Sequence, residues 1–311
     1  VKSASIIETQ FARVGLLMHV GRNGEASKSV AMYFPKSPND TVDEAIETPL
    51  TTESGGEIQF VKSFKYLGTW IRQDLYDNED IKKRIQKGKG AMAWMSPAFR
   101  CKYITKEQKV RIYSTYVIST VTFGCESWSL SAHDKRELEV FHHRSIRTIL
   151  NINMWEVKEK RLKNEQLRRD FGLRNITDYI YRRQLKWIEL QSKRLELSYE
   201  REKQPEHKTE ANTFAVQKLL FAWSGNSRGG GQPQKTYRGA YKEALQQIYP
   251  HLPKDGDWKI WREDVRTGEF RARISEWWTD LLREPASHEP MSREPASRER
   301  DAHTSQPGLT V

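Results

Sequence analysis

Residues 81–95, IKKRIQKGKGAMAWM, stand where the pattern of this 311-residue chain changes from strand-like to helical. Ile81, Ile85 and Met92 recur on one face of a helix, with lysines between them. Upstream of Asn78, short apolar runs alternate with turn residues, which is typical of strands. Downstream, the period is that of amphipathic helices. The sequence therefore predicts an α+β, mainly α fold, in which a small antiparallel β unit precedes a helical region.

The region upstream is expected to form a small α+β unit over residues 1–75. A helix is predicted to end near Val14, where Gly15 supplies a C-terminal cap. Strands are predicted after it, at residues 16–20, 29–34, 57–64 and 65–71. Strands this few and short bury little apolar surface, so we expect the unit to depend on its neighbours for stability.

The region downstream is expected to contain two helical parts joined by a linker, followed by a tail. Residues 76–200 predict about five amphipathic helices. Residues 201–236, rich in Gly, Pro and basic side chains, predict a linker. Residues 237–282 predict a loosely attached helical subdomain that several tryptophans help to anchor. Residues 283–311, in which REPAS occurs twice, predict a disordered tail.

Positive charge is concentrated just after the strand-to-helix change. The chain has 52 Lys and Arg against 41 Asp and Glu, a net charge of +11. Residues 81–111 hold ten of those cations and a single acid, Glu107. Such a run is either a solvated face or a surface that neutralises phosphates, and its imbalance favours nucleic acid. The predicted phosphate contacts are Lys82, Lys83, Arg84, Lys87 and Lys89, with Gly88 and Gly90 allowing close backbone approach.

Several other kinds of site are disfavoured by composition. Cys101 and Cys125 are too few for a disulfide framework or a Cys-rich zinc site. No run of about 18 apolar residues suggests a membrane span. Adjacent histidines, His142 and His143, point about 100° apart on a helix, and no Cys or acid stands at ligand spacing, so we do not expect a metal site there. The sequence therefore indicates an intracellular protein with no membrane partner and no metal ligands of its own.

Seven motifs, taken in their order along the chain, resemble the C-terminal half of non-LTR (LINE-type) retrotransposon reverse transcriptases. The resemblance covers about residues 10–250, and the serial order of the motifs makes it more specific than any one of them. The motifs are FARVGLLMHVGRNGEASKSVAMYFP (11–35), FKYLGTWI (64–71), IKKRIQKGKGAM (81–92), IYSTYVISTVTFGCESWSL (112–130), LEVFHHRSIRTIL (138–150), YRRQLKWIE (181–189) and RGGGQPQKTYRGAYKEAL (228–245).

The resemblance implies a role for each matched segment. Residues 1–75 would be the end of a polymerase palm. Lys28 would contact nucleic acid from the SKS stretch, where the family usually has SKT. The helices from Asn78 would form a thumb that lies against an RNA/DNA template–primer duplex. Tyr66 and Trp70 either stack on a base or fill the palm core. The primer grip, which positions the 3′ end of the primer, would be Phe64, Lys65, Tyr66, Leu67 and Gly68.

The resemblance also implies chemistry that this sequence does not carry. A polymerase of this family uses Mg²⁺ ions held by aspartates, some of them in a Tyr-x-Asp-Asp turn. That motif does not occur in the 311 residues. The closest match, YDNED at 76–80, has different spacing and is better explained as acids at a helix N-terminus. We therefore expect no catalytic residues and no cofactor in this chain, Mg²⁺ being implied only for a complete enzyme.

Two functional hypotheses follow. In the first, the chain is a truncated reverse transcriptase that binds template–primer, in the nucleus as the family implies, but does not polymerise by itself. It would then work alone or beside an upstream polymerase segment. In the second, the chain is a transposon relic or a helical protein-interaction module without nucleic-acid binding.

Overall fold

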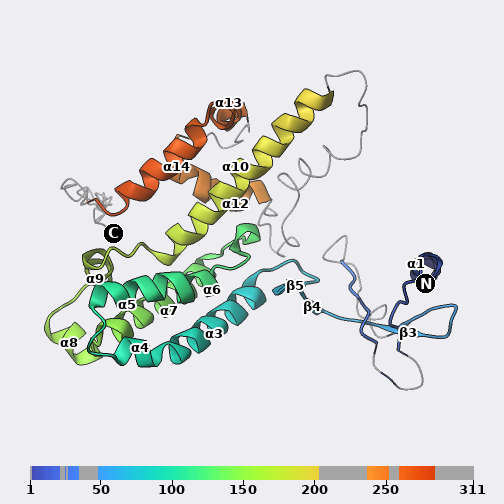
Figure 1. Cartoon of the computed structure of the whole chain (residues 1–311), viewed down its shortest axis with the longest axis horizontal. Helices are drawn as coiled ribbons and strands as arrows, with labels where there is room; N and C mark the ends of the chain where they lie inside the picture. Colours follow the sequence, from blue (N-terminus) through green and yellow to red (C-terminus); the bar gives the residue numbers. More distant parts are fainter. Residues whose placement is uncertain are drawn as a thin grey trace, which may run out of the picture.

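The protein is mainly helical, with short strands near its N-terminal end (Figure 1). The computed structural model describes residues 2–21, 25, 27–34, 48–202, 237–251 and 259–283. This architecture confirms the α+β, mainly α class. Nearly all of the predicted linker and tail lies outside the described residues.

The N-terminal sheet is narrow. Its central strand is β3 (Glu57–Phe60). β1 (Val30–Ala31) pairs with β3 in parallel, and β2 (Leu50–Thr51) pairs with it antiparallel. The order is therefore β1-β3-β2. The sequence predicted an antiparallel unit, but one of the two strand pairs of this sheet is parallel.

Helix α1 (Lys2–Arg13) ends as predicted, but the strand predicted after it does not form. Gly15 adopts a φ of +76°, and the Leu16 amide donates to the Phe11 carbonyl oxygen at 2.9 Å, which closes the helix. Residues 16–20 are irregular, and Leu17 is 92% exposed. The prediction of a strand there was wrong because a five-residue apolar run specifies no strand partner by itself.

A two-stranded hairpin connects this unit with the helices (Figure 1). β4 (Ser63–Tyr66) pairs antiparallel with β5 (Thr69–Arg72). The two residues between them, Leu67 and Gly68, have φ values of +45° and +93°. Positive φ at both central positions is the pattern of a type I′ turn, whose twist suits a hairpin. The strand predicted at 65–71 is therefore interrupted by a turn.

The helical body begins with α3 (Asn78–Trp94) and ends with the first half of α10 (Ile176–Glu202). Three of its helices begin at capping boxes, at Thr105, Ser131 and Asn153, where side chain and backbone groups satisfy each other. The elements between α3 and α10 are α4 (Ser96–Arg100), α5 (Lys106–Ile112), a π-helical segment (Tyr113–Ile118), α6 (Ser119–Val121), a 3₁₀ turn (Cys125–Ser127), α7 (Ala132–Leu150), α8 (Met154–Glu159) and α9 (Asn164–Asp170).

Two hydrophobic cores share helix α10. The first packs Ile176 and Ile180 with buried residues of α3 to α7, and Trp128 and Tyr113 are its largest fully buried side chains. The second packs Leu185 of α10 with apolar residues of the C-terminal helices. Those helices are α12 (Tyr237–Ile248), α13 (Lys259–Thr267) and α14 (Glu269–Asp280). The C-terminal helices are thus held more closely than the sequence suggests.

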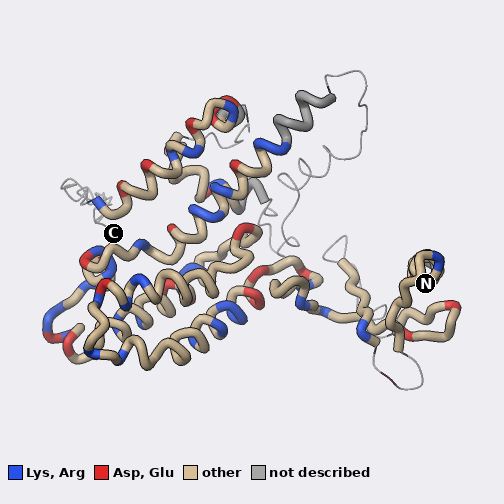
Figure 2. The backbone as a smooth tube through the Cα atoms, viewed as in Figure 1, with Lys and Arg blue, Asp and Glu red and all other residues tan. Residues whose placement is uncertain are grey.

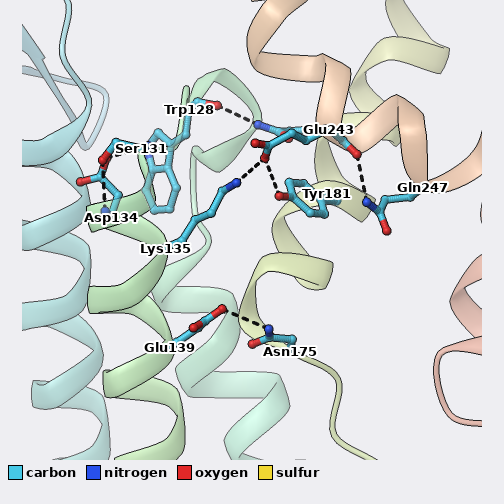
Figure 3. A network of polar contacts seen from close by, with 10 residues as sticks. Trp128, Ser131, Asp134, Lys135, Glu139, Asn175, Tyr181, Glu243 and Gln247 are labelled. Carbon is cyan, nitrogen blue, oxygen red and sulfur yellow. Dashed lines mark hydrogen bonds and ion pairs between the residues drawn. The ribbon is translucent and has the colours of Figure 1, made fainter. Parts of the chain in front are cut away.

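Polar contacts also tie α12 to the helical body (Figure 3). The Glu243 carboxylate of α12 forms an ion pair with Lys135 of α7 and accepts a hydrogen bond from the Tyr181 hydroxyl of α10 at 2.7 Å. Nearby, the Asn175 amide donates to Glu139 of α7 at 3.3 Å. These contacts fix α7, α10 and α12 as one unit.

Candidate nucleic-acid interface

The hairpin is anchored to the start of α3 by buried charge. The Asp80 carboxylate accepts hydrogen bonds from the Trp70 amide and from the Trp128 indole, both at 3.0 Å. The Arg84 guanidinium donates to the Gly68 carbonyl oxygen at 2.7 Å and lies 3.6 Å from Asp80. The Asp80 and Arg84 side chains are almost fully buried. This contact holds β5 and the turn against α3.

Arg84 is therefore not on the surface where the sequence placed it. Its guanidinium is used within the fold, and it also stacks on Phe123 at 4.5 Å from the ring centroid. Asp80, one of the YDNED acids, is likewise a structural group. This agrees with the interpretation of that segment as the start of a helix.

Gly88 differs from its predicted role in the same way. A Cβ at Gly88 would lie 2.4 Å from Val121 and 2.9 Å from Phe141, so this glycine lets α3 pack closely against α6 and α7. At Gly90 a Cβ would meet open space. Of the two glycines, only Gly90 lies on the outer side of the helix, where a ligand could approach.

The four remaining basic residues predicted on α3 form one exposed face. Lys82, Lys83, Lys87 and Lys89 are all exposed. At 100° per residue they span about 160° of the helix, opposite buried Ile81, Arg84 and Gly88. Within the described part of the chain, no carboxylate forms an ion pair with any of the four. Figure 2 shows blue Lys and Arg positions along the backbone of α3. We call this set the α3 lysine face.

One edge of the α3 lysine face adjoins the hairpin. Lys83 lies over the Trp70 ring, 5.3 Å from its centroid, and Trp70 is partly buried. The pKa of Lys87 is lowered, first by partial burial and then by repulsion from Arg84 and Lys65. Lys65 of β4 therefore belongs to the same positive region. An anion bound there would relieve that repulsion.

The other predicted grip residues form the exposed hairpin tip. Tyr66 is 57% exposed, Leu67 81% and Phe64 38%. Trp70 is the more covered aromatic, so a stacking role fits Tyr66 better than Trp70. The tip thus offers an aromatic ring and an aliphatic side chain beside the α3 lysine face.

The opposite edge of the α3 lysine face lines a groove between α3 and α7. Its volume is about 700 Å³. Lys82 and Lys89 lie on its α3 side, and Arg136 and Arg144 lie on its α7 side. Glu137 is the one acid among the residues that line it. The rest of its lining combines apolar side chains, among them Val140, which is 51% exposed, with uncharged polar ones such as Gln86 and Thr148.

Arg136 and Arg144 were missed in the sequence because they lie about 50 residues from the lysines. One local signal was present. Arg136, Val140 and Arg144 are four residues apart, so they share one face of α7. A single exposed valine is ordinary on a protein surface, so this signal is weak. The crossing of α3 and α7 then brings both sets together.

Lys28 is not part of this surface. It is exposed and precedes β1, and its backbone amide donates to the His19 ring at 3.2 Å. β1 pairs with β3, which lies away from α3 in Figure 1. The structure therefore does not bring Lys28 together with the α3 lysine face.

His142, on α7, is a fully buried structural residue. The Tyr113 hydroxyl lies 2.7 Å from His142 Nδ1, and His142 Nε2 lies 3.0 Å from the Arg174 carbonyl oxygen. Nε2–H therefore donates to the carbonyl, and Nδ1 accepts from the hydroxyl. Burial lowers the pKa of His142 to about 3, so the ring is neutral.

One group of side chains has the composition of a metal site. Ligand atoms of His133, Asp134 and Glu137 lie within 4.8 Å of one another. However, the Asp134 carboxylate accepts from the Ser131 hydroxyl and amide, which cap α7. His133 is mostly exposed. The arrangement is explained by the helix start, and we assign it no metal.

In comparisons with protein-family models, with curated proteins and with solved structures, nothing matched the chain. Among the described helices, none has a stretch apolar and long enough to cross a bilayer.

Proposed function

We propose that the α3 lysine face and the adjoining groove bind the sugar–phosphate backbone of an RNA/DNA duplex without reading its sequence. The observation that carries the proposal is the convergence of Lys82 and Lys89 with Arg136 and Arg144 across one groove. Several of these cations have no acidic partner among the described residues, and phosphate is the anion that such surfaces neutralise.

The length of the face suits a short stretch of duplex. Lys82 and Lys89 are seven residues apart, which is about 10 Å along a helix axis. One strand of duplex advances about 3.4 Å per base pair, so the face spans about three steps. About four phosphate contacts would give a salt slope near −4 in a plot of log affinity against log salt concentration. Affinity would then fall about 100-fold between 50 and 200 mM salt.

The hairpin tip suggests how the bound duplex would be oriented. The resemblance to a primer grip assigns Phe64 to Gly68 to the primer 3′ end, and exposed Tyr66 supports this through its capacity to stack on a base. The same resemblance would place the activity in the nucleus. Because the sequence has no Tyr-x-Asp-Asp turn, we propose binding without nucleotide transfer by this chain alone.

The test is a fluorescence anisotropy titration of a labelled RNA/DNA hybrid at 50 and 200 mM salt. We expect measurable affinity at low salt, a steep loss at high salt, and no binding by the K82E/K83E/K87E variant. The control is K102E/K158E/K163E, which makes the same change in net charge at exposed lysines away from the groove. Its affinity should exceed that of the first variant by at least tenfold.

Two results would contradict the proposal. Undetectable affinity at low salt would favour the interaction-module hypothesis instead. Equal losses in the two triple variants would show that net charge, rather than the α3 lysine face, is responsible. A primer-extension assay with Mg²⁺ or Mn²⁺ tests the second half of the proposal, and nucleotide incorporation there would disprove it.

A further inference from the structure

A second basic cleft lies between α10 and α14, in the part of the molecule that the proposed function does not use. Its volume is about 470 Å³, within the range of ligand pockets. Its α10 side is a stripe at helical spacing that includes Arg182, Lys186 and Lys193, and Arg271 faces it from α14. Figure 2 marks Lys and Arg on both helices. Four cations thus share one cleft.

A single buried carboxylate neutralises two of these cations. Glu189 is 5% exposed and accepts from Lys193 at 2.8 Å and from the Arg271 Nε at 3.0 Å. Among the described residues, neither Arg182 nor Lys186 has a carboxylate partner. The cleft therefore carries an excess of positive charge at the end of the stripe where those two lie.

Arg182 is held in place for binding rather than being free in solvent. Its guanidinium stacks on the Trp278 ring at 4.3 Å from the centroid, and its Nε is buried without a hydrogen-bond partner. Arg174 lies over the same ring at 3.9 Å and donates to the Trp278 carbonyl oxygen. A planar, oriented guanidinium is suited to bidentate contact with phosphate.

The electrostatics of the cleft agree with this geometry. The pKa of Lys186 is lowered, first by repulsion from Arg182 and then by burial, while Glu189 acts in the opposite direction. Burial also lowers the pKa of Arg182. A bound dianion would attract both Arg182 and Lys186, which lie one helical turn apart, and so offset the repulsion between them.

We infer that the cleft between α10 and α14 is an anion site that takes a phosphate group, held by Arg182 and Lys186 with help from Arg271. Leu190 and Ile274 provide an apolar wall beside it. The phosphate could belong to a small phosphate ester or to a nucleic-acid strand. The shared chemistry is the phosphate oxygens, and the experiment separates the two sources.

The experiment is a calorimetric titration of the full chain with pyrophosphate. R182Q/K186M removes both charges, and K186M alone removes the charge of an exposed lysine without disturbing the Arg182 stack on Trp278. The matched control, K102M/K158M, removes two charges at exposed lysines that line neither the cleft nor the α3–α7 groove. We expect about a tenfold or greater loss of pyrophosphate affinity in R182Q/K186M, a smaller loss in K186M, and no loss in the control.

The inference is overturned if pyrophosphate does not bind, or if the control loses as much affinity as R182Q/K186M. It does not depend on the α3 lysine face, so failure of hybrid binding there leaves the pyrophosphate result unaffected. A second titration with single-stranded oligothymidylate identifies the source. If R182Q/K186M also weakens that binding, the phosphate comes from a strand; if only pyrophosphate affinity falls, it comes from a small ester.

Discussion

The two sides of helix α3 carry similar residues with opposite roles. On the inner side, Arg84 and Gly88 are buried and make contacts within the protein. On the outer side, Lys87 and Gly90 are exposed. Residue type and charge alone do not separate these pairs, because all four stand in the same basic segment. Position relative to the buried stripe separates them, and each pair can therefore be tested as inner against outer.

The largest expected effect is the loss of the buried cation. Arg84→Met would leave Asp80 buried without its ionic partner and the Gly68 carbonyl without its donor. Breaking one side of a buried pair costs about 3–5 kcal/mol. Lys87→Met, on the outer side, should change the free energy of unfolding by less than about 0.5 kcal/mol. Urea unfolding followed by circular dichroism measures both, and equal values would remove the distinction between the two sides.

The two glycines should differ in sign. Gly88→Ala forces a methyl group against Val121 and Phe141, so overpacking should destabilise the protein by about 1–3 kcal/mol. Gly90→Ala meets open space in a helix interior and should stabilise by about 0.5–1 kcal/mol. The melting temperatures of the two variants should therefore move in opposite directions. A stabilising Gly88→Ala would mean that α3 does not pack closely on α6 and α7.

His142 and His143 on α7 give the same contrast between a buried and a more exposed residue, here in the pH dependence of stability. Since the pKa of His142 is lowered to about 3, the unfolded chain binds a proton there below about pH 6.5 while the folded chain does not. Stability from this group is therefore present above pH 6.5 and lost as pH falls towards 3, by up to about 1.4 kcal/mol per unit.

The measurement is the free energy of unfolding of the wild type, His142→Gln and His143→Gln between pH 7 and 4.5. His143 is only half-buried. Burial lowers its pKa as well, but this ring is less buried than that of His142. His142→Gln should flatten the pH dependence more than His143→Gln. If His143→Gln flattened the pH dependence more, the buried neutral histidine would be His143 rather than His142.

The smallest effect is expected at the hairpin tip, where exposure coincides with a strained backbone. Leu67 is 81% exposed with a φ of +45°, a conformation that asparagine tolerates better than leucine. Leu67→Asn should stabilise the protein by about 0.5–1 kcal/mol, because little burial is lost. Thermal unfolding checks this. A simultaneous fall in affinity for the RNA/DNA hybrid would indicate that the Leu67 side chain contacts the hybrid. Unchanged affinity would indicate that it does not.

Much of α3 could be predicted from its sequence, including which of its residues are buried. Ile81, Ile85 and Met92 predicted the helix, and the same spacing places residues 84 and 88 on its inner side. The burial of Arg84 and Gly88 could therefore have been predicted. Their partners could not, because Gly68 and Phe141 reach them only through the fold.

Features that depend on distant partners were beyond the sequence. The run at 16–20 had the composition of a strand but no partner to pair with. The groove required α7 to cross α3, so Arg136 and Arg144 were recognisable only as cations on another helix. By contrast, the helix end at Gly15 depends on local geometry, and the glycine there predicted it. Gly68 carries a similar local signal, yet the strand predicted at 65–71 ran through it.

Helix α10 has a consequence for how the protein comes apart. Its residues Ile176 and Ile180 belong to the first core, and Leu185 and Ile188 belong to the second. Neither core can open fully without exposing apolar surface of the other. The backbone amides of α10 between these positions should therefore exchange with solvent deuterium only through global unfolding, and the two cores should behave as one cooperative unit.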